Sequence, residues 1–171
     1  MFKGLSIIFL FTASTITGFY QASRLTRRKK LLIEYRDLLQ RMETEIGYFK
    51  EPLPQLLTKL HTNINTSTDI FLRHCLISME KGNETIPNIW KQALYETYQG
   101  EPLNASDLAI MGKVGSFIGQ SDFQGQKGYF SLLESELATQ IRDAEEICKR
   151  KGPLYSKAGL ATGVILAIAL L

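Results

Sequence analysis

Residues that carry out chemistry are scarce in this sequence. Its 171 residues include only two cysteines and two histidines, too few for a scaffold stapled by disulfides. His74 and Cys75 are neighbours, and adjacent residues on a helix do not face each other. With His61 as the second histidine, the paired ligand spacing of a metal site is missing. We therefore expect no metal, no cofactor and no catalytic residue.

A nucleotide-binding motif is also missing. Residues 112–116 look like part of a phosphate loop, but Asp107 stands where the motif needs glycine, and Val114 where it needs serine or threonine. The glycines at 112, 115 and 119 have helical spacing, which favours close packing against a neighbouring helix.

No convincing strand-like alternation of polar and apolar residues occurs, so we predict an all-α fold. The middle of the chain predicts a compact bundle of about six helices with brief connections. Polar residues are expected to cap the helix starts: Ser67 or Thr68, Asn83 or Thr85, Asn104 or Ser106, and Ser121 or Asp122. Apolar residues at steps of three and four are expected in the core, among them Tyr35, Phe71, Trp90, Leu108, Leu133 and Leu137.

Long apolar runs are confined to the two ends. Residues 4–23 carry no charge, and a helix of that length, about 30 Å, crosses the hydrocarbon core of a membrane. A cleaved signal peptide is the alternative, but the basic residues in 24–30 oppose translocation of the chain beyond them. Residues 153–171 form a second run, with Pro153 expected in the first turn of its helix. A buried helix of a soluble core is the alternative there.

Charge is unevenly distributed along the chain. Half of the twenty basic residues flank the apolar runs: Lys3, Arg24, Arg27, Arg28, Lys29, Lys30, Lys149, Arg150, Lys151 and Lys157. Residues 31–148 hold the other ten and all seventeen acidic residues, a net charge of −7. Nucleic-acid-binding domains are instead basic themselves, so no nucleic-acid partner is expected.

The basic clusters predict the topology, because positive charge favours the cytoplasmic side of a membrane. We expect a transmembrane anchor over residues 1–23, a cytoplasmic helical bundle over 24–152 and a transmembrane helix over 153–171. Both chain termini then lie outside.

Three sets of residues are candidates for interaction. Small residues at every fourth position let membrane helices pack closely: Ser14, Gly18 and Ala22 in the first run, and Gly159, Gly163 and Ala167 in the second. Acidic residues expected on the exposed side of the last helix are either a solvated face or a docking surface for a basic partner: Glu134, Glu136, Asp143, Glu145 and Glu146. The polar turn before that helix is either a helix cap or a docking point: Asp122, Gln124, Gln126 and Lys127.

Four segments together resemble one known family. They are Thr17–Phe19 with the basic cluster after it, Leu38–Ile46 running into Tyr48 and the prolines at 52 and 54, Gly112–Lys127, and the run Lys151–Tyr155 before the second apolar stretch. From end to end the chain resembles the stage III sporulation protein AB family of endospore-forming bacteria. None of the four segments is a catalytic motif.

The resemblance implies a role that composition does not. The family is similar to the inner-membrane platform protein of type II secretion and type IV pilus machines, which implies a non-enzymatic platform in the channel complex between mother cell and forespore. Its implied partners are a cytoplasmic secretion-type ATPase, other membrane components of that channel and membrane lipids. Platform proteins typically carry two bundles and this chain has one, so their stoichiometry is not carried over and a homo-oligomer stays open. The alternative is a membrane-tethered enzyme or regulator that acts through the acidic bundle.

Overall fold

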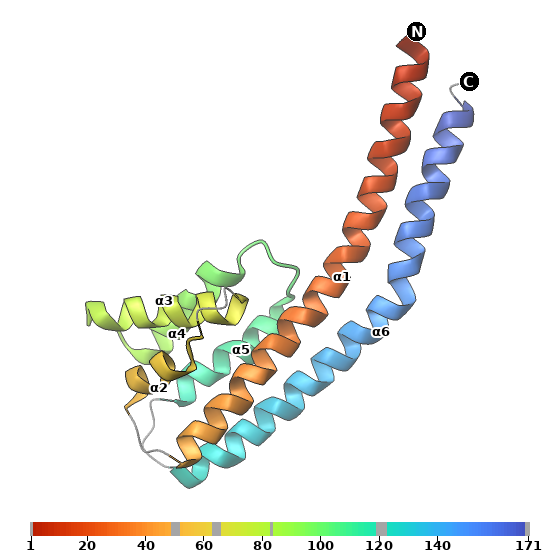
Figure 1. Ribbon diagram of the computed structural model, residues 1–171. Coiled ribbons are helices and arrows are strands. Elements are labelled where there is room, and N and C mark those ends of the chain that lie inside the picture. Colours follow the sequence, from red (N-terminus) through yellow and green to blue (C-terminus); the bar gives the residue numbers. More distant parts are fainter. Residues whose placement is uncertain (1, 49–51, 63–65, 83, 119–122, 170–171) are drawn as a thin grey trace. The chain divides into compact units, whose positions relative to one another are not determined.

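The computed structural model is helical along most of the residues it describes, which are 2–48, 52–62, 66–82, 84–118 and 123–169; side chains are described from residue 8 to 46 in the first range and from 128 in the last. Six helices follow one another: α1 (Phe2–Tyr48), α2 (Leu53–Leu60), α3 (Ser67–Lys81), α4 (Ile86–Tyr98), α5 (Ala105–Phe117) and α6 (Phe123–Ala169) (Figure 1). These ranges contain no strand, so the prediction of an all-α fold is confirmed.

The two longest helices change the predicted architecture. We expected about six bundle helices flanked by two membrane spans, with the first bundle helix continuing out of the first span. The described chain has six helices, and the apolar ends are the outer parts of α1 and α6, each 47 residues long. The continuity expected for α1 therefore holds, and α6 is continuous with the second apolar end as well. Pro153 lies inside α6 rather than in the first turn of a separate helix. A proline removes one backbone hydrogen bond, and α6 nevertheless continues through Pro153 to Ala169.

The chain divides into two compact units. The first unit comprises Met1–Lys29 and Arg142–Leu171, and the second comprises Lys30–Ile141. In the first unit the outer parts of α1 and α6 lie side by side, with the start of α1 and the end of α6 at the same end of the pair (Figure 1). The Ser14 hydroxyl donates a hydrogen bond to the Gly159 carbonyl oxygen at 2.9 Å, which ties the two helices together.

The core of the second unit is built around three aromatic rings. The Phe71 ring meets the Trp90 ring edge-on, with 4.8 Å between centroids, and lies 6.1 Å from the Tyr35 ring. The Tyr35 hydroxyl and the Trp90 Nε1–H both donate to the Met111 carbonyl oxygen, at 2.8 and 3.1 Å. Because buried polar groups need partners, these bonds hold α1 and α4 against one point of α5. Burial raises the pKa of Tyr35, so its hydroxyl stays protonated and remains a hydrogen-bond donor.

Most of the predicted core is confirmed. Phe71, Trp90, Leu133 and Leu137 are all buried, whereas Leu108 is 37% exposed. The buried face of α5 is formed instead by Asp107, Ile110, Met111, Val114 and Gly115. Gly115 allows the close approach expected of it, because a Cβ there would lie 2.3 Å from Trp90 Cβ. Gly112 has only an ordinary contact, 3.9 Å from Leu94, and the glycine at 119 lies outside the described residues.

Polar residues occupy the N-caps of α3, α4 and α5 as predicted, but the N-cap of α3 is not one of the residues predicted for it. Asn104 caps α5 through a reciprocal capping box with Asp107, and Thr85 occupies the N-cap of α4 without a side-chain bond. The cap of α3 is Thr66, whose hydroxyl accepts from the Asp69 backbone N–H at 3.2 Å. Ser67 and Thr68 were the predicted caps and lie within the first turn instead. The alternatives Asn83, Ser121 and Asp122 lie outside the described residues.

Candidate partner-docking surfaces

The acidic residues predicted for docking lie on α6, and two of them belong to the second unit. The Glu136 carboxylate pairs with Lys113 on α5, with 2.7 Å between Lys113 Nζ and Oε2. Glu134 is half-buried, and its Oε1 is buried without a hydrogen-bond partner among the described residues. Burial raises the pKa of Glu134, and the negative charge of Glu43 adds to the rise. Neither carboxylate is simply a solvated surface group.

The other three acidic residues of α6 belong to the first unit. Glu145 lies between two lysines, 3.0 Å from Lys149 Nζ and 3.4 Å from Lys29 Nζ. Hydrogen bonds from Lys149 and Lys29 lower the pKa of Glu145. Asp143 and Glu146 are exposed and lie one turn apart on the helix. Of the five predicted residues, these two are the ones whose charge is most freely presented to solvent.

The polar turn before α6 is described only in part. Asp122 lies outside the described residues. Gln124, Gln126 and Lys127 belong to the start of α6, but their side chains also lie outside the description. A docking role for this turn stays a prediction.

Small residues bring the two helices of the first unit into close contact. A Cβ on Gly18 would lie 2.6 Å from the Tyr155 carbonyl oxygen, and one on Gly159 would lie 2.9 Å from Gly18 Cα. Farther along α6, a Cβ on Gly163 would lie 2.8 Å from the Phe11 ring. Any side chain at Gly18 or Gly159 therefore forces the helix backbones apart, and one at Gly163 requires the Phe11 ring to shift. Ala22 and Ala167 are half-buried in the same unit.

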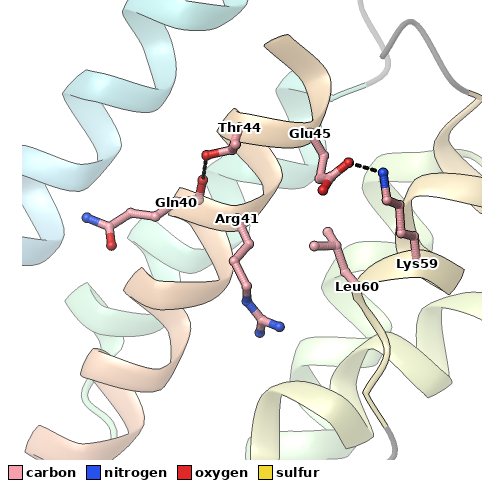
Figure 2. Close-up of a pocket in the computed structure, with 6 residues that line it drawn as sticks. All are labelled: Gln40, Arg41, Thr44, Glu45, Lys59 and Leu60. Carbon is pink, nitrogen blue, oxygen red and sulfur yellow. Dashed lines mark hydrogen bonds and ion pairs between the residues drawn. The ribbon is translucent and has the colours of Figure 1, made fainter. Parts of the chain in front are cut away.

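A groove between α1 and α2 in the second unit was not predicted from the sequence. It has a volume of about 330 Å³ and is lined by Gln40, Arg41, Thr44 and Glu45 from α1 and by Lys59 and Leu60 from α2 (Figure 2). Glu45 and Lys59 form an ion pair across it. The Thr44 hydroxyl donates to the Gln40 backbone carbonyl oxygen at 2.8 Å. Arg41 is exposed and lies apart from the ion pair.

The described cysteine and histidine side chains that could act in catalysis are buried or paired with carboxylates: Cys75, His61 and His74. Burial raises the pKa of the Cys75 thiol to about 12, which keeps it protonated at neutral pH and therefore a poor nucleophile. His61 Nε2 lies 3.6 Å from the Asp69 carboxylate, and His74 Nδ1 lies 3.2 Å from the Glu96 carboxylate. Within the described ranges, no three histidine, cysteine or acidic residues group together as metal ligands.

The two predicted membrane spans have different outcomes. Within the described part of the chain, one helix is long and apolar enough to cross a membrane, over Gly128–Ala169. That finding is consistent with membrane association of α6. The predicted span over residues 4–23 is not confirmed in the same way, and the side chains of residues 2–7 lie outside the description.

Comparison with known proteins places these features in a family. Residues 3–171 match the family described as Stage III sporulation protein AB. The chain is 26% identical to the Stage III sporulation protein AB of Bacillus subtilis (strain 168) over 175 residues, which covers all of both chains. A solved structure of a Stage III sporulation protein AB shares the fold with a TM-score of 0.65 at 21% identity, covering 71% of this chain and 96% of the other. This is a family of sporulation proteins and not a known enzyme family. The chain belongs to the stage III sporulation protein AB family, and its involvement in sporulation follows from that membership.

Proposed function

We propose that this protein is a non-enzymatic, membrane-anchored platform of the sporulation channel between mother cell and forespore. The observation that carries the proposal is the continuity of α1 and α6, which each contribute to a compact helical unit and to an apolar helix pair. The second unit and the charged part of α6 that follows it then serve as a cytoplasmic contact surface, and the apolar parts of α1 and α6 in the first unit serve as its anchor. The resemblance to secretion platform proteins supports the same division of labour.

The helix pair of the first unit has the surface of a membrane anchor. Large apolar side chains are exposed on both helices: Ile8, Phe9, Ile16, Phe19 and Tyr20 on α1, and Leu154, Leu160, Ile165 and Ile168 on α6. In water such a surface is unfavourable at about 25 cal/mol per Å², whereas lipid chains cover it. Between the helices, close backbone contact through small residues is the packing mode that membrane helices use.

The sidedness of the anchor follows from its flanking charges. The basic residues after the first apolar run and before the second favour the cytoplasmic side. Residues 24–152 then lie in the cytoplasm of the mother cell, and both chain termini lie outside. Anionic lipid headgroups are the natural partners of these basic residues.

The proposed partner of the α6 carboxylates is a basic patch on a cytoplasmic secretion-type ATPase. Asp143 and Glu146 are the strongest candidates because both are exposed, whereas Glu136 and Glu145 already pair with lysines. Docking through exposed charges weakens as salt rises, since the Debye length falls from about 8 Å at physiological ionic strength to about 3 Å at 1 M.

The test is binding of the purified ATPase to the full chain in non-ionic detergent at low and high salt. The double variant Asp143→Asn/Glu146→Gln should bind more weakly, while Glu80→Gln on α3, also an exposed acid, should bind as the wild type does. Equal affinity of all three proteins at every salt concentration would rule out this face. Absence of the ATPase and of other channel components from complexes purified from sporulating cells would refute the platform role itself.

A further inference from the structure

The groove between α1 and α2 presents a positive charge in an otherwise acidic part of the chain. Its lining holds two basic residues, Arg41 and Lys59, and one acidic residue, Glu45. Glu45 and Lys59 neutralise each other in an ion pair, whereas Arg41 has no ion pair among the described residues. Residues 31–148 carry a net charge of −7, so this local charge has the opposite sign to its surroundings.

The arrangement of side chains favours one type of ligand. A guanidinium binds a carboxylate through two parallel hydrogen bonds, which is stronger and more directional than contact with a point charge. Leu60 is buried, with 5% of its surface exposed, and offers a small apolar contact at the base of the groove beside the ion pair. With Glu45 and Lys59 paired, the lining keeps the single positive charge of Arg41, which matches a singly charged carboxylate better than a doubly charged phosphate. A basic ligand is disfavoured by Arg41 itself.

We propose that this groove binds a partner protein segment in which an acidic side chain stands next to an apolar one. The carboxylate pairs with Arg41, and the apolar side chain packs mainly on the aliphatic part of Lys59, with a small contact on Leu60. Arginine is over-represented among the residues that dominate the binding energy of protein interfaces. The groove is distinct from the α6 carboxylates, so its role does not depend on whether the ATPase binds there.

The test uses the full chain in non-ionic detergent and a fluorescein-labelled octapeptide of sequence GSLEELSG, followed by fluorescence anisotropy. The matched peptide GSLQQLSG keeps the shape and removes the charge. Arg41→Gln should weaken binding of the acidic peptide by about tenfold or more, in line with the loss of a charge-assisted hydrogen bond. Arg73→Gln removes an exposed arginine from α3 and should leave binding unchanged. Arg41→Lys keeps the charge without the fork and should fall between Arg41→Gln and the wild type.

Four outcomes would overturn the proposal: no peptide binding at millimolar concentration, equal binding of both peptides, equal binding by Arg41→Gln and wild type, or equal losses in Arg41→Gln and Arg73→Gln. Competition by 10 mM inorganic phosphate would also overturn it, because the groove would then be a phosphate site. Unchanged thermal unfolding of each variant ensures that lost binding reflects the groove and not the fold.

Discussion

Single polar residues inside the second unit are held by specific partners. The buried Asp69 carboxylate accepts hydrogen bonds from the Thr62 backbone N–H at 2.7 Å and from the Thr62 hydroxyl at 3.4 Å. His74 Nδ1 lies 3.2 Å from the Glu96 carboxylate, and the neighbouring Cys75 thiol is buried. The sequence did not predict the groove at Arg41, because no local pattern indicates whether a particular arginine finds an acidic partner across the fold.

The core position of Leu137 can be tested against a neighbour on the same helix. Leu137 is fully buried, whereas Leu132 is 53% exposed. Leu137→Ala should lower the free energy of unfolding by about 2–5 kcal/mol, because it removes buried methyl groups and leaves a cavity. Leu132→Ala should change it by less than about 0.5 kcal/mol. Urea unfolding followed by Trp90 fluorescence measures both, and similar values for the two variants would contradict the assigned face.

The thiol of Cys75 should be nearly inert in the folded protein. With its pKa raised to about 12, only about one thiol in ten thousand is ionised at pH 8. At that pH, Cys148→Ser, which leaves Cys75 as the only thiol, should react with a disulfide reagent at least a hundred times more slowly than Cys75→Ala. In denaturing urea the two rates should converge.

The same shift gives a pH dependence of stability. Because the pKa of Cys75 is higher in the folded than in the unfolded chain, the protonated thiol favours folding at pH values below the unfolded pKa. That contribution is lost as pH rises from about 9 toward about 12. Removing the thiol in Cys75→Ala should therefore flatten the fall of stability over this range. A profile unchanged from that of the wild type would contradict the assignment.

Among the elements, helix type and order were more predictable than helix ends. Periodicity identified the buried faces of α1 and α6, because steps of three and four are a local property of the sequence. The cap of α3 is Thr66 rather than Ser67 or Thr68, because adjacent hydroxyl residues satisfy the same sequence pattern and only the backbone geometry decides between them. The course of α6 through Pro153 depends on the turns on both sides, which a local helix-breaking rule does not weigh.

The N-cap residues of α5 and α4 should differ in how much they stabilise the fold. The Asn104 side chain accepts a hydrogen bond from the Asp107 backbone N–H at 2.8 Å, while Thr85 makes no such bond. Asn104→Ala should therefore lower the free energy of unfolding by about 0.5–2 kcal/mol. Thr85→Ala should cost clearly less in the same thermal unfolding experiment. No measurable loss for Asn104→Ala, or a larger loss for Thr85→Ala, would contradict this ranking of the two caps.

The helix pair should be sensitive to one methyl group at its contact point. In Gly159→Ala the new Cβ would meet Gly18 Cα at 2.9 Å, between two backbones that cannot rotate away. We expect a loss of about 1–3 kcal/mol from overpacking. Gly152→Ala on the same helix meets nothing within 4 Å and should be neutral or slightly stabilising. Unfolding of the full chain in detergent compares them, and equal stability would mean that the helices do not pack through Gly159.

At the scale of the whole molecule, periodicity predicted an all-α chain, and hydropathy predicted its two apolar ends. That the second apolar end continues the last bundle helix through Pro153 was not predicted, because hydropathy marks where a run is apolar and not where a helix begins. The sequence also did not predict that carboxylates of α6 form ion pairs with lysines. Lys113 is 23 residues from Glu136 in sequence, and only the fold brings the two side chains together.

The most direct test of this account is the sidedness of the chain in the membrane. In a variant with Cys75→Ala and Cys148→Ser, single cysteines are introduced by Gln99→Cys, in the exposed turn after α4, or by Leu171→Cys at the C-terminus. A membrane-impermeant maleimide should label the C-terminal cysteine in intact cells and the cysteine at position 99 only after the membrane is permeabilised. Labelling at position 99 in intact cells, or at both positions only after permeabilisation, would contradict an anchor that crosses the membrane with its helical unit in the cytoplasm.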